Sequence, residues 1–179
     1  MRRLVALAGA LALAGCGGTE TVTVTTSETV TETETATETV TEPLAVGLPE
    51  PVDDTYAALL EAARSGDYEA LRPLIPNQFS YTFGGPVEGG PIAYWQQVEA
   101  EGGESPIEIL DRILSMPYTL YRGTYIWPFA YDKQPDELTG YERELLGDLA
   151  EDFGAGSGYL GWRAGIEPDG TWSFFIAGD

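Results

Sequence analysis

All of the aromatic residues of this 179-residue chain lie beyond residue 50, and this distribution decides which part can fold. The ten tyrosines, four tryptophans and six phenylalanines fall within residues 51–179. The stretch before them, residues 17–50, has twelve threonines, seven glutamates and neither lysine nor arginine. So few large apolar side chains cannot offset the entropy lost on ordering, and we predict one folded domain, residues 51–179.

The stretch before the domain is a low-complexity tract, TVTVTTSETVTETETATETVTE. Its alternation of threonine with valine is also typical of a β-strand, which is the alternative interpretation. Glutamate replaces valine at the later alternate positions, so neither face could bury enough apolar surface to order the chain. We therefore predict that residues 16–50 form a disordered tether, with an average span of about 30–35 Å for a flexible coil.

The first 16 residues predict an export signal that ends at a lipid attachment site. Arg2 and Arg3 precede an apolar run, Leu4–Ala14, that is too short to span a bilayer. The last two residues of this run begin the sequence Leu-Ala-Gly-Cys, residues 13–16, which resembles the bacterial lipobox. Cys16 is the only cysteine of the chain. The resemblance implies removal of residues 1–15 as a signal peptide and acylation of Cys16. An ordinary secreted protein is the alternative.

Two or more acyl chains, such as palmitate, hold a protein firmly on a membrane. We therefore expect a lipoprotein anchored through Cys16 on the extracytoplasmic face of the cell membrane. Residues 51–179 contain 22 acidic and 7 basic residues, a net charge of −15. This charge argues against binding to nucleic acid and against direct adhesion to anionic lipid.

The chain has no histidine, which removes the commonest general base and the commonest zinc ligand. The carboxylates of Asp148, Glu151 and Asp152 fall on one side of a predicted helix, where a calcium site is the alternative to a solvent-exposed face. A single helix face supplies too few converging oxygen ligands for calcium. We therefore expect neither a metal nor a cofactor.

Apolar residues at helical spacing predict five helices. The first ends at Gly66, and Asp67 is placed to cap the second. The predicted helices cover residues 53–65, 68–75, 92–101, 106–115 and 136–152.

Alternating apolar residues predict strands at residues 79–83 and 118–131. The second is read as one long strand, with an aromatic face that includes Tyr121, Tyr125 and Trp127, and with Arg122 on the opposite face. Together with the helices, these strands are typical of an α+β domain in which N-terminal helices pack on an antiparallel sheet.

The last part of the chain, YLGWRAGIEPDGTWSFFIAGD, predicts a β-hairpin with a turn at residues 167–170. Trp172 and Phe174 are predicted to share the inward face of the second strand. On the first strand, Gly161 and Gly165 predict that another group packs closely against the backbone.

Two segments, YAALLEAARSGDYEALRPLIPNQFSYTFGG and DGTWSFFIAGD, resemble the opening and the closing hairpin of NTF2-like (SnoaL-like) domains. The resemblance implies a curved antiparallel sheet wrapped by helices around a cone-shaped pocket. Such pockets serve isomerases, cyclases, dehydratases and non-catalytic binding domains, and the fold alone does not choose among them. The chain departs from the family pattern in its predicted helix at 106–117 and in the additional helix at 132–152.

We expect ligand contacts from Tyr121, Tyr125 and Trp127 on the aromatic face, and from Arg122 and Arg163 within the strands. The two arginines would form a floor for a carboxylate ligand, and salt bridges to the many acidic residues are the alternative. The expected function is a non-enzymatic binding domain for a small apolar or carboxylate ligand or for an envelope protein.

Two alternatives stay open. The first is a spacer or protein-interaction module of the cell envelope. The second is a histidine-free enzyme acting on a carbonyl compound, with an Asp or Glu as the base. In that enzyme Tyr81, Tyr94 or Tyr125 would donate a hydrogen bond to the developing oxyanion, whereas core packing is the competing interpretation of these tyrosines.

Overall fold

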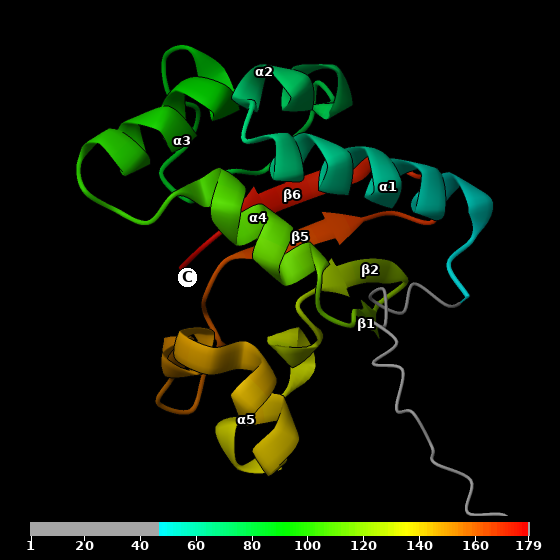
Figure 1. Ribbon diagram of the computed structural model, residues 1–179, viewed down its shortest axis with the longest axis vertical. Coiled ribbons are helices and arrows are strands. Elements are labelled where there is room, and N and C mark those ends of the chain that lie inside the picture. The colour runs from blue at the N-terminus through cyan, green and yellow to red at the C-terminus, as the bar shows by residue number, and fades with distance from the viewer. Residues whose placement is uncertain (1–46, 179) are drawn as a thin grey trace, which may run out of the picture. The chain divides into compact units, whose positions relative to one another are not determined.

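The computed structural model describes residues 47–178, which form an α+β domain with helices first and a four-stranded antiparallel sheet after them (Figure 1). Cys16 and nearly all of the predicted tether lie outside the described residues. The α-helices are α1 (Glu50–Ser65), α2 (Tyr68–Leu71), α3 (Gly90–Ala100), α4 (Pro106–Leu114) and α5 (Gly140–Leu146). The 3-10 helices are η1 (Arg72–Leu74), η2 (Phe129–Asp132), η3 (Pro135–Glu137) and η4 (Gly147–Asp152). The strands are β1 (Thr119–Tyr121), β2 (Thr124–Trp127), β3 (Phe153–Gly154), β4 (Gly158–Tyr159), β5 (Arg163–Ile166) and β6 (Trp172–Ile176).

The predicted end of the first helix and the predicted start of the second are confirmed, whereas α1 begins earlier than predicted, at Glu50. Helix α1 ends at Gly66, and the Asp67 carboxylate accepts a hydrogen bond of 2.9 Å from the Glu69 N–H at the start of α2. Pro73 limits α2 to one turn, and the chain continues as η1. The helix predicted over residues 136–152 is broken into η3, α5 and η4, because Thr139 caps a new helix start at α5.

The main sheet has the strand order β1-β2-β5-β6, and all three pairs are antiparallel. Its inner face packs on the helices, where Tyr56 of α1 stacks on Trp127 of β2 at 5.3 Å. Trp95 of α3 contacts Trp172 at 5.9 Å and Phe175 at 5.3 Å between ring centroids. In Figure 1 α2 and α3 lie toward the upper end of the domain, α4 crosses in front of β5, and α5 lies toward the lower end.

The prediction of one long strand over residues 118–131 is wrong. The chain reverses after β1 at a two-residue turn, in which Arg122 has φ 53° and Gly123 has φ 96°. Positive φ at both turn positions matches the twist of the flanking strands, and glycine adopts it without strain. Tyr121 consequently pairs with Thr124 on the outer face of the sheet, opposite to the face that carries Trp127.

The prediction of a strand at residues 79–83 is also wrong. Within this segment only Ser80 makes a β-bridge, a parallel one to Phe174. The alternating pattern arises because Phe79 packs into the core, with its ring 4.5 Å from that of Trp172. The bridge lies at the β6 edge of the sheet. The Ser80 N–H donates to the Ser173 carbonyl at 3.1 Å, and the Ser80 carbonyl accepts from the Phe175 N–H at 3.0 Å.

The C-terminal hairpin of β5 and β6 is confirmed, and its inward set of residues differs from the prediction. The register shifts opposite Gly165 and Ile166, so that both Trp172 and Phe175 point inward, with 1% and 0% of their surface exposed. Phe174 points outward instead and lays its ring over Gly165, where a Cβ atom would collide with it. The close packing predicted at this glycine is thus confirmed.

We expect Trp172→Ala to lower the free energy of unfolding by about 3–5 kcal/mol, because it removes a fully buried ring from the inner face. Trp172→Phe is the matched control. It keeps a ring at the site, and the indole Nε1–H that it removes has no hydrogen-bond partner among residues 47–178. Urea unfolding followed by circular dichroism measures both losses, and equal losses for the two variants would contradict the inward placement.

Candidate binding surface around residues 121–134

The inner aromatic face, where the sequence suggested ligand contacts, is filled by side chains of the protein itself. Trp127 is 1% exposed and stacks on Tyr56. Tyr125 is half-buried and meets the ring of Tyr118 edge-on at 5.4 Å. The structure thus places Tyr125 and Trp127 in or beside the core, apart from Tyr121, Arg122 and Arg163.

Tyr121 and Arg163, on the outer face of the sheet, belong to a continuous row of rings and arginines, here called the arginine–ring row. Arg122 lies 5.2 Å over the ring of Tyr121, which meets the ring of Tyr131 edge-on at 5.4 Å. Arg163 lies 5.9 Å over Tyr131 and 5.7 Å over Phe83. Phe83 is 57% exposed and Tyr121 37% exposed, so the row is open to solvent. Cations over ring faces are attracted to the ring quadrupole, which holds the five side chains together.

A groove of about 330 Å³, here called the outer groove, opens beside this row. Its walls come from the row, from residues 132–134 and from the β3–β4 turn. The lining residues are Tyr121, Tyr131, Asp132, Gln134, Ser157, Gly158, Tyr159, Leu160 and Arg163. The groove therefore combines aromatic rings with polar side chains.

A second groove of about 420 Å³ is also lined by residues of η2, and Asp132 lines both grooves. The second groove also contains Phe129, Lys133 and the ring of Tyr141, which is 73% exposed. Helix η2 and the residues after it, here called the ridge, thus contribute side chains to both grooves.

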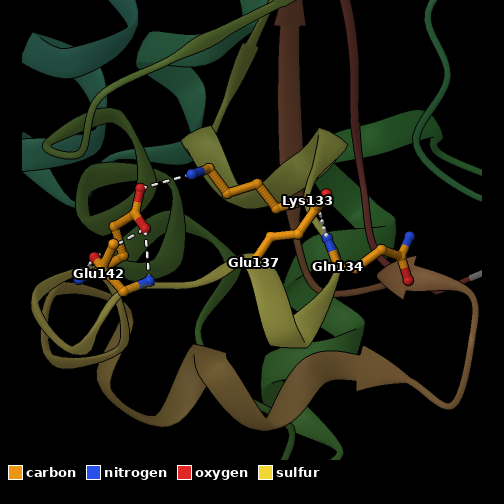
Figure 2. Close-up of polar contacts among 5 residues, drawn as sticks. Lys133, Gln134, Glu137 and Glu142 are labelled. Atoms are coloured by element: carbon orange, nitrogen blue, oxygen red, sulfur yellow. Dashed lines mark hydrogen bonds and ion pairs between the residues drawn. The ribbon is translucent and has the colours of Figure 1, made fainter.

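Local hydrogen bonds fix this ridge (Figure 2). Lys133 Nζ donates to Glu142 Oε1 at 2.7 Å, which ties the ridge to α5. The Glu142 carboxylate also accepts from the N–H and the hydroxyl of Thr139, both at 2.9 Å. The Gln134 N–H donates to Glu137 Oε2 at 2.7 Å (Figure 2), so each end of the segment closes with a capping box. These bonds lower the pKa of Glu142 to about 2, chiefly through the Lys133 ammonium.

Arg163 is held in place by backbone carbonyls. One guanidinium nitrogen donates to Leu160 O at 3.3 Å and Gly161 O at 3.1 Å, and another donates to Gly178 O at 2.7 Å. Arg122 instead sits in the β1–β2 turn, outside any strand, which corrects its predicted position. Two tyrosine rings separate the guanidinium groups of the two arginines within the row, so they do not form a shared floor.

Of the tyrosines considered for catalysis, Tyr81 uses its hydroxyl to hold the fold. The Tyr81 hydroxyl accepts from the Val87 N–H at 2.8 Å, and the ring of Tyr94 packs on Tyr81 at 5.7 Å. The Tyr68 hydroxyl donates to Glu99 at 2.9 Å and accepts from the Ile107 N–H, so it joins α2, α3 and α4. Burial and the Glu99 carboxylate raise the pKa of Tyr68 to about 12.

The acidic residues near the end of α5 do not share one solvent-exposed helix face, contrary to the prediction. Asp148 pairs with Arg112, whereas Asp152 is half-buried beside Gly161 and Tyr159. Burial, and the neighbouring charges of Glu104, Asp148 and Glu151, raise the pKa of Asp152. Within residues 47–178 no group of three or more acidic or cysteine side chains is arranged to hold a metal ion.

Comparison of the chain with protein-family models, with curated proteins and with solved structures finds no match. In the described part of the chain, none of the helices has the length and the apolar character needed to cross a membrane.

Sequence reasoning missed Tyr131, Phe83 and Asp132 as members of the candidate surface. The alternating pattern runs unbroken through the turn at Arg122 and Gly123, so it puts Tyr131 on the same face as Trp127 when the segment is taken as one strand. An arginine followed by a glycine within an aromatic alternation is the signal that could have shown the turn.

We expect Glu142→Gln to lower the melting temperature at pH 7, because the carboxylate that binds Lys133 and Thr139 is lost. Folding lowers the pKa of Glu142 from 4.5 to about 2, so the ionised carboxylate stabilises the fold at pH values above 4.5. This stabilisation is lost as the pH falls through about 2. The difference from the wild type should therefore shrink between pH 4.5 and pH 2. Glu144→Gln, an exposed glutamate on the same helix, is the control, and an equal effect of both variants would contradict the assignment.

Proposed function

We propose that this chain is a membrane-anchored extracytoplasmic lipoprotein whose domain binds an envelope component without catalysing a reaction. The arginine–ring row carries this proposal, because it exposes rings and arginines on a domain with a net charge of −15. Aromatic residues and arginine supply most of the energy at protein binding sites. In the proposal, the row and the outer groove beside it form the binding surface.

The anchor in this proposal is Cys16, supported by the lipobox-like sequence and by the signal-like residues before it. The Thr/Glu tract serves as a tether between the lipid and the domain. The net negative charge supports this arrangement, because anionic lipid headgroups repel such a domain and leave its binding surface free.

We also infer a variant of the NTF2-like architecture, in which the protein's own rings fill the interior of the cone. The resemblance of the opening helices and the closing hairpin supports this inference, as do the buried rings of Trp95, Trp127 and Trp172 between helices and sheet. A ligand in this variant binds on the outer face of the sheet rather than inside.

The hydroxyls of Tyr68 and Tyr81 favour binding over catalysis. An enzyme without histidine needs a tyrosine donor and a carboxylate base directed at a substrate. The Tyr68–Glu99 hydrogen bond joins helices, and the Tyr81 hydroxyl accepts a backbone N–H.

We expect Cys16→Ser to release the protein from the membrane fraction, because the thiol that carries the lipid is absent. Fractionation of cells followed by immunoblotting measures the distribution. An otherwise identical chain with Ser27→Ala, in the tether, should stay with the membrane. Membrane retention of the Cys16→Ser protein would contradict the anchor.

We expect a photo-crosslinking benzoylphenylalanine at position 83 to form covalent adducts in intact cells, because Phe83 is exposed at one end of the row. The same probe at position 141, on the exposed Tyr141, is the control outside the row. Adding Arg122→Glu should remove the adducts at position 83. Adducts that form equally at both positions, or that survive this change, would contradict the proposed surface.

A further inference from the structure

We propose that the outer groove binds saccharide units of a neutral glycan chain. This inference rests on the proposed function and names the ligand of the same surface. It follows from the rings, the polar groups, the size and the charge of the groove.

The rings supply the apolar part of such a site. A pyranose ring has a C–H face that packs on the electron-rich face of an aromatic side chain. Tyr121 and Tyr131 line the groove, and Tyr121 is 37% exposed. Phe83, 57% exposed, extends the row beyond Arg163 and would contact the next unit of a chain.

The polar side chains supply what sugar hydroxyl groups need, which is a mixture of donors and acceptors. The Asp132 carboxylate accepts, the hydroxyls of Ser157 and the two tyrosines do both, and the Gln134 amide nitrogen donates. Among the described residues, no other side chain or backbone group is hydrogen-bonded to the Asp132 carboxylate or to the Tyr121, Tyr131 and Ser157 hydroxyls. These groups are therefore available to a ligand.

The size and rigidity of the groove suit a short stretch of glycan. Its volume of about 330 Å³ is near the lower end of small-molecule sites, roughly 300–1,000 Å³. One wall is fixed by the capping box of Gln134 and Glu137, and another by the bonds of Arg163 to three carbonyls. A wall that is already ordered loses little entropy when a ligand binds.

The charge of the domain selects among glycans. A net charge of −15 disfavours polyanionic chains, whereas a neutral saccharide is not repelled. The polar lining also favours a sugar over a purely apolar ligand, because burying Asp132 and Ser157 against hydrocarbon would leave their polar groups without partners.

The test uses the full lipidated chain in a detergent without a sugar headgroup, so that the detergent cannot compete for the groove. The probes are tetrasaccharides of N-acetylglucosamine, glucose, mannose and arabinose. Calorimetric titration should give saturable binding of at least one of them. Tyr131→Ala should weaken that binding about tenfold, the loss expected for one ring contact.

Asp132→Asn, at an exposed residue, tests the polar contacts without disturbing the core, and it should also weaken binding. Tyr141→Ala, which removes an exposed ring in the second groove, should leave binding unchanged. The inference fails if none of the four probes binds, or if Tyr141→Ala weakens binding and the outer-groove variants do not. If the probes fail while position 83 still forms adducts that depend on Arg122, the proposed function stands and only the glycan is excluded.

Discussion

The packing of rings between the helices and the inner face of the sheet determines where the rest of the chain can go. The shifted register between β5 and β6 turns both Trp172 and Phe175 inward against Trp95, where they are almost fully buried. The same shift turns Phe174 outward onto Gly165. These three rings therefore fill the space between the helices and the inner face of the sheet.

The domain depends on this core because other sources of stability are weak. The only cysteine is Cys16, so residues 47–178 contain no disulfide. Among the described residues, four of the seven basic side chains form ion pairs, and three of those pairs are largely exposed and contribute little. The fourth, Lys133–Glu142, is more shielded and belongs to the ridge. The ion pairs therefore contribute little to the stability of the fold, and the most shielded of them lies beside the candidate surface.

The sequence allowed the α+β class, the early helices and the closing hairpin to be predicted, because each has a local signal. Gly66 and Asp67 mark helix boundaries through backbone and side-chain preferences of single residues. The candidate surface was harder to predict. The sequence indicates Tyr121 and Arg163 as members of the surface, but it does not indicate the residues beside them. Those residues come together because the chain reverses at Arg122 and Gly123, and this reversal leaves the period-two pattern unbroken. Periodicity reports which residues alternate, and it does not report where the chain turns back.

Arg122 links the strain of the backbone to the candidate surface. A residue with a Cβ atom at φ 53° costs about 1–2 kcal/mol relative to a relaxed conformation, and glycine would avoid this cost. The turn position nevertheless carries an arginine, whose guanidinium lies over Tyr121 at the end of the row. Strained residues of this kind persist where the surrounding structure holds them, and they concentrate at binding and catalytic sites. The positive φ of Arg122 follows from its place in the two-residue turn, and its side chain lies over Tyr121 on the outer face rather than in the core.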